Sequence, residues 1–586
     1  MEKIILLGND KSSILANRIG AEPIIVPELH TNNQGEVCDF VTANLKNGFS
    51  KLVIDADNMP SVALSLLIAM YIRLSPMELG ESTLAPIFFL SSRNIKPFMK
   101  VKDLSQILLT PHVHFEPLER EELIEIIQDA TPIQKDRFQK DFLDYINIQP
   151  GATIGRHSLA NQWGASVLSK IILGKEKYSY PELIEASKNL YFRYISCKTT
   201  SNKILPTSSN EIILLEAIGK KILLIDDEAQ KGWKYVLEKY FSQAKAFDTI
   251  DETVSCFEDF SLDSKKKITE GNYDLIFLDL RLNGAVEDKT YDPEAFSGMK
   301  VLKKIKSLNK GTQVIMLTAS NKAWNLKALL DAGADGYYIK ESPEYEFSRD
   351  FSLSNFNSLK ETITKCLKKT KLRTFYNALN ELKGNIVKYN YFGKDTDEVT
   401  MNLNIAFDLI DKSYSTAEYS SYAYLQLFLV IEKYVKQENV FEKTDCDLFL
   451  NADGGNRYWI LKKNYATDKE YNSTLKFSLG HYKLERTKYS RPTIDTNFLV
   501  SSLLIYKFGQ ETSGAMGWTN IYKIRNGKAA HPQNSRVKED ELKSIIDFML
   551  YFFNDENKNW RDKGDAFAEV SERERLQKLK EVFSSR

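Results

Sequence analysis

The sequence predicts a multidomain protein with two α/β domains, each with a parallel five-stranded sheet, followed by an all-helical bundle. The chain has 586 residues, too many for one core at the usual ~100–200 residues per domain. Short apolar runs alternate with helical patterns in residues 1–125 and again in 216–370, which is typical of parallel sheets covered by helices. In residues 371–555, apolar residues recur at i, i+3 and i+4, the pattern of a helical bundle.

The composition gives no global preference for nucleic acid or membranes. Lys plus Arg and Asp plus Glu number 79 each, so any RNA contact must be local. The five cysteines lie far apart without a CxxC pair, which argues against a disulfide framework or a zinc site and for a reducing compartment. The N-terminal apolar run is too short for a signal peptide, and the longest apolar stretch, residues 61–72, is shorter than the ~20 residues of a membrane span. We therefore expect a cytoplasmic protein in which residues 61–72 form a buried helix.

Residues 1–125 contain five strand patterns, namely KIILLG, EPIIVP, KLVIDAD, APIFFLSS and ILLTPHVHFEP. The strand ends carry the polar residues Asn9, Asp10, Asp55, Asp57, Ser91 and Ser92. No lysine follows the last run, which instead contains His114 and Glu116. The edge of this predicted sheet therefore lacks the cation that would balance a bound phosphate.

Residues 126–215 are predicted to be a helical spacer, from the patterns FQKDFLDYINI, LANQWGASVLSKIIL and PELIEASKNLYFRYI. Arg156, His157 and the run Asn161–Gly164 stand out within it by residue type. We interpret this stretch as a packed tryptophan with satisfied polar neighbours rather than as a binding site.

Residues 216–370 carry the most informative pattern. The runs ILLI, YDLIFLDL, TQVIMLT and GYYIK predict four strands, which end at Asp226 and Asp227, Asp279, Thr318 and Lys340. Because the carboxyl ends of parallel strands meet at one edge of a sheet, we expect these five side chains to converge. A single acid at a strand end is usually just solvated, but five residues of suitable type at four strand ends indicate a site.

The chemistry of this site follows from the residue types. Clustered carboxylates repel one another unless a hard cation lies among them, and oxygen ligands suit Mg²⁺. Asp227 and Asp279 would hold the metal, with Asp226 acting through water. Asp279 would be the nucleophile that forms an aspartyl phosphate. Thr318 would donate a hydrogen bond to a phosphoryl oxygen, and the Lys340 ammonium would neutralise another.

Residues 220–370 resemble the receiver domain of two-component response regulators, through the acidic pair 226–227, the LDL run at Asp279, TAS from Thr318 and YYIK ending at Lys340. The resemblance implies a flavodoxin-like fold, a sensor histidine kinase as partner, Mg²⁺ as cofactor and Asp279 as phosphoacceptor. It also implies a switch role for Tyr337 and a metal contact from the Arg281 backbone carbonyl.

Two features depart from this family's pattern. Asn283 stands where a proline is usual, and the following loop is enlarged to NGAVEDKTYDPEAFSGMK. The enlarged loop either gates the phosphorylation edge or is a neutral insertion. By the same comparison, residues 1–125 resemble a pseudo-receiver that lacks the phosphate-balancing lysine; a flavodoxin-like sheet without such ancestry is the competing interpretation.

The helical region 371–555 contains the run YKIRNGKAAHP, from Tyr522 to Pro532. An ideal helix would place Arg525 and His531 about 120° apart, but Gly527 and Pro532 allow the backbone to depart from that geometry. Arg-Asn, four residues and His resemble the motif of HEPN domains (higher eukaryotes and prokaryotes nucleotide-binding), which are small helical bundles.

The HEPN resemblance implies metal-independent RNA cleavage by a homodimer in which two motifs face each other. His531 would act as general acid or base on the ribose 2′-hydroxyl, Arg525 would stabilise the charged phosphate, and Asn526 would orient them. In the competing interpretation, Arg525 and His531 only cap helices or seal a dimer. The basic and aromatic stretch 475–491 is either an RNA platform or a solvated hairpin, and 556–586 is predicted to be a charged helical tail.

We therefore expect a response regulator whose phosphorylation at Asp279 controls a HEPN-type endoribonuclease, in the role of a growth-arrest or anti-phage effector. The alternative is a response regulator with a non-catalytic helical output domain that binds a partner or nucleic acid. Arg525 and His531 distinguish the two hypotheses. Their replacement should abolish RNA cleavage by a ribonuclease but should leave the behaviour of a non-catalytic output domain unchanged.

Overall fold

The computed structural model describes residues 3–150, 156–173, 188–199, 217–287, 292–320, 322–342, 347, 349–437, 440–442, 448–450, 462–463, 482–483, 500, 512–532 and 535–554. The chain divides into two compact units, which are described separately below. The first comprises Met1–Lys304 with Val314–Leu367, and the second comprises Ile305–Gln313 with Lys368–Arg586.

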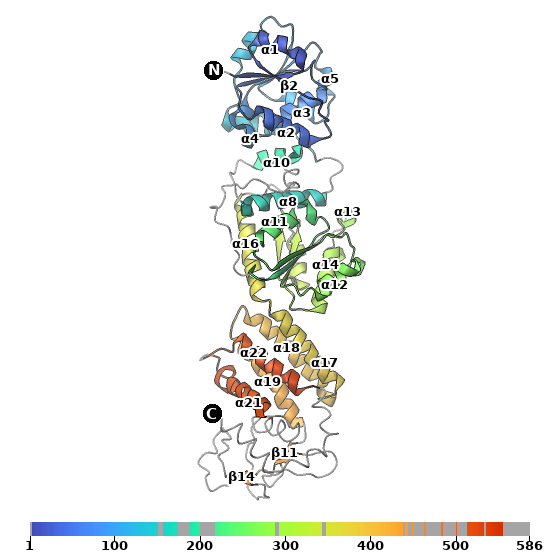
Figure 1. Ribbon diagram of the computed structural model, residues 1–586, viewed down its shortest axis with the longest axis vertical. Coiled ribbons are helices and arrows are strands. Elements are labelled where there is room, and N and C mark those ends of the chain that lie inside the picture. The colour runs from blue at the N-terminus through green and yellow to red at the C-terminus, as the bar shows by residue number, and fades with distance from the viewer. Residues whose placement is uncertain are drawn as a thin grey trace. The chain divides into compact units, whose positions relative to one another are not determined.

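The N-terminal part of the first unit, drawn mainly in blue in Figure 1, is built on a parallel sheet. Its strand order is β2-β1-β3-β4-β5. Its strands are β1 (Ile4–Gly8), β2 (Glu22–Ile25), β3 (Lys51–Asp55), β4 (Ile87–Ser91) and β5 (Val113–Pro117). All five coincide with the predicted apolar runs, although the last run is divided. Ile107–Leu109 belongs to a 3₁₀ helix, Leu104–Leu109, and the strand begins only after His112, whose φ is 65°.

Helices cover both faces of this sheet, because its central strands are apolar on both sides. The helices are α1 (Ser13–Ile19), α2 (Gln34–Leu45), α3 (Val62–Arg73), α4 (Pro76–Leu79), α5 (Lys96–Met99), α6 (Leu123–Asp129) and α7 (Phe138–Asp141). α1 and α6 pack with Leu6 and Val53 on one face, whereas α2 and α3 pack with Leu7 and Ile54 on the other. The predicted buried helix at residues 61–72 is α3.

The central part of the first unit repeats the same topology. Its strands are β6 (Lys221–Ile225), β7 (Ala246–Ile250), β8 (Leu275–Asp279), β9 (Val314–Thr318) and β10 (Gly336–Ile339), in the order β10-β9-β8-β6-β7. Counted within each domain, both sheets have the flavodoxin-like order 2-1-3-4-5. Four strands end at the predicted sites. The fifth, β7, is an edge strand without a continuous apolar run, which is why the sequence did not reveal it.

The helices of the central part are α11 (Trp233–Tyr240), α12 (Leu262–Glu270), α13 (Gly284–Glu287), α14 (Ser297–Leu308), α15 (Ala323–Asp331) and α16 (Arg349–Lys368). The enlarged loop after β8 is tied to α14, since Ser297 donates its backbone N–H to the buried Glu287 carboxylate at 2.6 Å. α14 also begins very close to the end of β8. A Cβ on Gly298 would lie 2.1 Å from the backbone oxygen of Asp279, so only glycine fits there.

The described part of the predicted spacer contains α8 (Arg156–Leu173) and α10 (Leu190–Thr199). α8 packs on α11 of the central domain, whereas α10 is held to the N-terminal domain, where Arg193 donates to Ser75 at 2.8 Å and contacts Glu78 at 2.7 Å. The packed tryptophan that we expected is Trp163, whose ring centroid lies 5.7 Å from that of Phe192.

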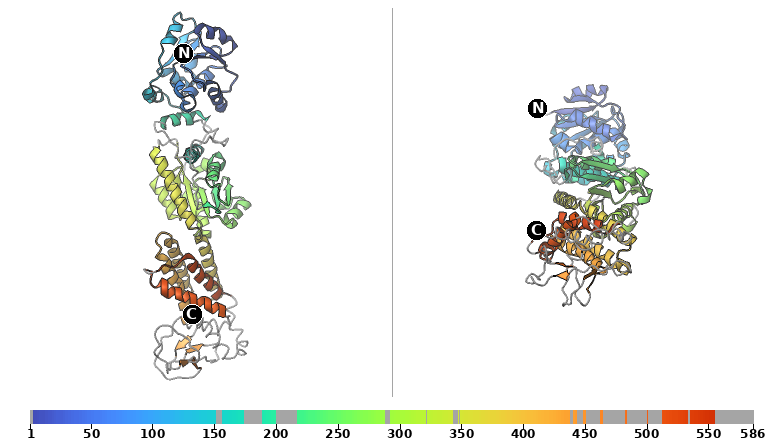
Figure 2. Two further views of the ribbon diagram at one scale, coloured as in Figure 1. Left: turned by 60° about the vertical axis from the view of Figure 1, so that its left-hand side comes forward. Right: turned by 60° about the horizontal axis from the view of Figure 1, so that its bottom comes forward.

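The second unit is a helical bundle, with α17 (Leu372–Lys388), α18 (Thr396–Ser413), α19 (Tyr419–Gln437), α21 (Thr512–Ile524) and α22 (Glu539–Phe552) lying side by side (Figure 2). Short strand pairs are formed by β11 (Val440–Glu442) with β12 (Leu448–Leu450) and by β13 (Lys462–Lys463) with β14 (Tyr482–Lys483). Except for β14, the basic and aromatic stretch 475–491 lies outside the described residues. The predicted tail, 556–586, also lies outside them.

Within the described ranges, no single helix has the length and apolar composition of a membrane span. One pair of segments, Val62–Arg73 and Pro76–Leu84, passes that test only when taken together across a bend of 67°. The first of these is α3, which is buried in the N-terminal domain.

Candidate active site at the edge of the central sheet

The five predicted side chains of the central domain meet at one edge of its sheet. Parallel pairing places Asp279 of β8 opposite Leu317, the residue before Thr318, and places Thr318 opposite Ile339, the residue before Lys340. Asp226 follows β6, which pairs with β8 on its other side. The convergence therefore follows from the strand order alone.

Three carboxylates form a compact group of oxygen donors. One oxygen from each of Asp226, Asp227 and Asp279 lies within 4.8 Å of the others. Asp226 and Asp279 are buried and Asp227 is half-buried. Three anionic oxygens, one of them from the half-buried Asp227, are hard donors of the kind that suits Mg²⁺, so these residues fit the predicted metal.

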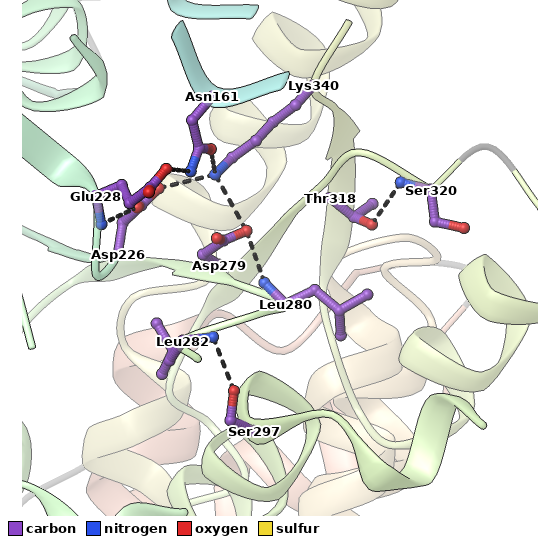
Figure 3. Close-up of polar contacts among 10 residues, drawn as sticks. All are labelled: Asn161, Asp226, Glu228, Asp279, Leu280, Leu282, Ser297, Thr318, Ser320 and Lys340. Carbon is purple, nitrogen blue, oxygen red and sulfur yellow. Dashed lines mark hydrogen bonds and ion pairs between the residues drawn. The ribbon is translucent and has the colours of Figure 1, made fainter. Parts of the chain in front are cut away.

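Lys340 is the cation of the site, and it is 1% exposed. Its Nζ lies 2.8 Å from Asp226 Oδ2 and 3.1 Å from Asp279 Oδ1 (Figure 3). The ammonium also lies 5.2 Å from the ring centroid of Trp233. Burial disfavours the charged amine, but the two carboxylates outweigh it and hold the pKa of Lys340 above its ordinary value. Lys340 is therefore a fixed positive charge beside Asp279.

Backbone groups orient the remaining predicted residues. Asp279 Oδ1 accepts a hydrogen bond from the Leu280 N–H at 2.8 Å, and Thr318 Oγ1 accepts one from the Ser320 N–H at 3.0 Å (Figure 3). Thr318 is buried and Tyr337 is half-buried on β10. The side chain of Arg281 stacks on the Phe296 ring at 5.1 Å, while the metal contact of its carbonyl stays a prediction.

The sequence analysis missed a polar side chain that enters the site from α8. Asn161 is completely buried, its Oδ1 accepts a hydrogen bond from Lys340 Nζ, and its Nδ2 donates to Glu228 Oε2 at 2.9 Å (Figure 3). We had interpreted this stretch as packing around Trp163, and Trp163 is indeed packed, but Asn161 belongs to the site. The sequence signal was an asparagine two residues before a packed tryptophan, which is too weak to identify a partner 179 residues away.

Glu341, the residue after Lys340, is a second buried titratable group beside the site. Its Oε2 accepts a hydrogen bond from Ser352 Oγ at 2.8 Å. Burial raises the pKa of Glu341 to about 7 and outweighs that hydrogen bond. The folded protein therefore binds a proton at Glu341 more tightly than the unfolded chain does. The stability that this proton provides is present below pH 4.5 and is lost as the pH rises toward 7.

We predict that Glu341→Gln removes this pH dependence. Wild type should lose about 2–3 kcal/mol of its free energy of unfolding from pH 5 to pH 8 as Glu341 loses its proton, and the variant should not show this loss. Urea unfolding at both pH values, followed by hydrogen exchange of β10 peptides, measures this difference. Glu270→Gln, at the exposed end of α12, is the control. An equal pH response in wild type and Glu341→Gln would contradict the prediction.

The corresponding edge of the N-terminal sheet has a different arrangement. Asp55 accepts hydrogen bonds from Ser12 Oγ at 2.7 Å and Asn58 Nδ2 at 2.8 Å, and Asp57 accepts one from Ser91 Oγ at 2.7 Å. His114 stacks on Phe88 with ring centroids 4.6 Å apart, and burial lowers its pKa. Hydroxyl and amide groups thus hydrogen-bond to these acids, and the exposed Arg93 lies 3.7 Å from Asp57, where the central site has a buried lysine.

In the helical bundle, the predicted motif lies at a local irregularity. Arg525–Ala529 forms a π-helical turn at the end of α21, and such turns are frequent at functional sites. Arg525 is half-buried, donates to Asn526 Oδ1 at 2.8 Å and lies 5.4 Å from the Phe428 ring centroid, whereas His531 is exposed. The π turn is the departure from ideal helix geometry that Gly527 and Pro532 allow.

Comparison with known families agrees with the two sheet domains. Residues 222–349 match the response regulator receiver domain, and residues 3–116 match the inactive receiver domain. The central domain is thus a receiver domain that carries the complete acidic group and Lys340, and the N-terminal domain is an inactive receiver.

Two curated relatives each match about a fifth of this chain. The transcriptional regulatory protein ResD of Bacillus subtilis is 33% identical over 120 residues, which are 20% of this chain and 41% of the relative. The nitrate/nitrite response regulator protein homolog of Haemophilus influenzae is 28% identical over 124 residues, 21% of this chain and 50% of the relative. The chain thus spans half or less of these curated relatives. A CheY-like receiver domain protein from Methanospirillum hungatei, of known crystal structure, is 24% identical over 25% of this chain and 98% of its own, with a TM-score of 0.17.

Proposed function

We propose that Asp279 is the phosphoacceptor of a two-component response regulator and that its phosphorylation controls the C-terminal bundle. The observation that carries this proposal is the group formed by Asp226, Asp227, Asp279 and Lys340, in which two other carboxylates and one buried ammonium lie close to the Asp279 carboxylate. A solvated acidic edge would not need a buried lysine at its centre.

The proposed reaction is transfer of a phosphoryl group to a carboxylate oxygen of Asp279. That oxygen forms the new P–O bond while the bond to the donor's leaving group breaks, and the leaving group departs with the bonding electrons. Lys340 then pairs with a phosphoryl oxygen, and the Thr318 hydroxyl donates to another. Mg²⁺ held by Asp226, Asp227 and Asp279 would supply charge neutralisation at the phosphoryl oxygens. The donor in the cell would be the phosphohistidine of a cytoplasmic sensor kinase.

Phosphate uptake should therefore depend on a divalent cation. We predict that the full-length protein, incubated with acetyl phosphate and Mg²⁺, becomes phosphorylated, and that EDTA abolishes the uptake because three unscreened carboxylates repel the anionic donor. Phosphate-affinity gel electrophoresis measures the phosphorylated fraction. Uptake at the same rate in EDTA would contradict the assignment of the metal ligands.

For the output, we propose a HEPN-type, metal-independent endoribonuclease that works as a homodimer. The supporting observation is the π turn at the motif, in which Arg525 hydrogen-bonds to the Asn526 side chain and after which His531 is exposed. His531 would move a proton at the ribose 2′-hydroxyl, and Arg525 would stabilise charge on the phosphate that this hydroxyl attacks. A growth-arrest or anti-phage role is part of this proposal.

This output is tested by RNA cleavage. We predict that His531→Ala lowers the cleavage rate by about a hundredfold, the lower limit for loss of a general acid–base group. Lys523→Ala, on the exposed side of α21, is the matched control for folding and charge. Cleavage of labelled single-stranded RNA is followed with and without acetyl phosphate. Equal rates in wild type and His531→Ala would favour the second candidate.

The second candidate output is a non-catalytic domain that binds a partner protein or nucleic acid. It is favoured by the packing of Arg525, whose guanidinium lies over the buried Phe428 ring and hydrogen-bonds to Asn526, so that part of its side chain is structural. In this case binding by the bundle would depend on Asp279 but would be unchanged in His531→Ala.

A further inference from the structure

The helix α8 lies over the phosphorylation edge of the receiver domain. It packs on α11, and it contacts α13 from the enlarged loop after β8. Beneath it, the side chains of Asp279 and Lys340 are only 3% and 1% exposed. A phosphoryl donor must reach an oxygen of Asp279 along the line of the bond that forms. The donor therefore cannot reach Asp279 while α8 keeps this position.

The hydrogen bonds of Lys340 show which acceptor a phosphoryl group on Asp279 would displace. An ammonium has three N–H donors. Those of Lys340 point to Asp226 Oδ2 at 2.8 Å, to Asp279 Oδ1 at 3.1 Å and to the Asn161 carbonyl oxygen (Figure 3). A phosphoryl oxygen on Asp279 needs one of these donors. Asn161 is the uncharged acceptor of the three, so it is the weakest competitor against an anionic oxygen.

Two further contacts fix α8 in this place. Ser158, one turn before Asn161, hydrogen-bonds to Glu228 and accepts from Lys231 Nζ at 2.8 Å. At Gly164 the helix backbone comes close to the receiver, because a Cβ there would lie 3.2 Å from the Trp233 ring and 3.3 Å from the backbone of Glu341. The hydrogen bonds of Ser158 on one side and the close contact at Gly164 on the other thus hold α8 on the site.

We propose that α8 is an intramolecular lid that competes with phosphorylation of Asp279, with the Asn161 carboxamide as its latch on Lys340. The lid goes beyond the proposed function and rests on it, because it presumes that Asp279 is the acceptor. Closure of the lid slows phosphoryl transfer, and phosphorylation in turn releases the lid, since the two states exclude each other at Lys340. Trp163 on the same helix contacts Phe192 of α10, so release of α8 would also change its contact with α10, which Arg193 holds to the N-terminal domain.

The test uses two variants that loosen the lid by different means. Asn161→Ala removes the latch, and Gly164→Leu wedges the helix away from Trp233 and the Glu341 backbone without removing a polar side chain. Gln162→Ala, a half-buried position on the same helix, is the control. With acetyl phosphate and Mg²⁺, both lid variants of the full-length protein should become phosphorylated about tenfold faster than wild type, the effect of losing one charge-assisted hydrogen bond. The control should match wild type.

Hydrogen exchange of α8 peptides gives a second readout. In wild type, exchange of α8 should become faster once Asp279 is phosphorylated, and in both lid variants it should already be fast without phosphate. Equal uptake rates in wild type, Asn161→Ala and Gly164→Leu, or α8 exchange that phosphorylation leaves unchanged, would overturn the lid alone. Uptake by none of the proteins would overturn the proposed function and the lid with it.

Discussion

Replacing Asp279 by asparagine is expected to abolish phosphorylation while leaving the receiver domain folded. The asparagine Oδ1 can still accept hydrogen bonds from the Leu280 N–H and from Lys340, which Asp279 Oδ1 accepts in the structure. It cannot form an acyl phosphate, because an amide oxygen is a much poorer nucleophile than a carboxylate oxygen. Phosphate-affinity electrophoresis after incubation with acetyl phosphate and Mg²⁺ should show no shifted band.

A matched variant exists in the N-terminal domain. Asp55 ends β3 at the same topological position as Asp279 ends β8, but Ser12 and Asn58 hold its carboxylate. Asp55→Asn should therefore leave phosphate uptake unchanged. Uptake that persists in Asp279→Asn but disappears in Asp55→Asn would reverse the roles of the two domains.

Replacing Lys340 by methionine is expected to destabilise the receiver domain severely. The substitution keeps most of the side-chain volume but leaves Asp226 and Asp279, both buried, without their shared cation. Removing one partner from a buried ion pair costs about 3–5 kcal/mol. We expect a loss of that size in the free energy of unfolding at pH 8 in EDTA, measured by hydrogen exchange of β8 peptides across a urea series.

The same substitution at an exposed lysine controls for charge. Lys322 lies at the start of α15 with its ammonium 5.4 Å from the exposed Trp324 ring, and Lys322→Met should change stability by less than about 0.5 kcal/mol. Mg²⁺ should restore part of the loss in Lys340→Met, because it neutralises the same carboxylates. If the free energy of unfolding of Lys340→Met fell by less than about 1 kcal/mol, Lys340 would not be the cation that neutralises two buried carboxylates.

The central site was predictable because its residues follow buried strands. A parallel sheet sends every carboxyl end to one edge, so Asp226, Asp279, Thr318 and Lys340 had to meet once their strands were located. The edge strand β7 was not predicted because its side chains are mostly half-buried and the polar pair Asp248 and Thr249 interrupts its apolar residues. The strands of the N-terminal sheet were also predictable, except that a 3₁₀ turn replaces the first part of its last apolar run.

The lid was not predictable, because its contact with the site depends on tertiary packing and not on the end of a strand. Asn161 reaches Lys340 through the packing of α8, and nothing in a helical pattern tells which polar residue of its buried face will meet which strand end. Likewise, the burial that raises the pKa of Glu341 to about 7 depends on tertiary packing around it. Arg525 and His531 were found by their spacing alone, and their catalytic role stays a prediction.

Mapping the phosphoryl group by mass spectrometry tests the central claim most directly. Full-length protein is treated with acetyl phosphate and Mg²⁺, reduced with borohydride, which converts an aspartyl phosphate to homoserine and releases the phosphate, and digested. We expect the modification on the peptide that contains Asp279, at the end of β8, and expect it to appear faster in Asn161→Ala than in wild type. A modification confined to another peptide, or none in any variant, would contradict it.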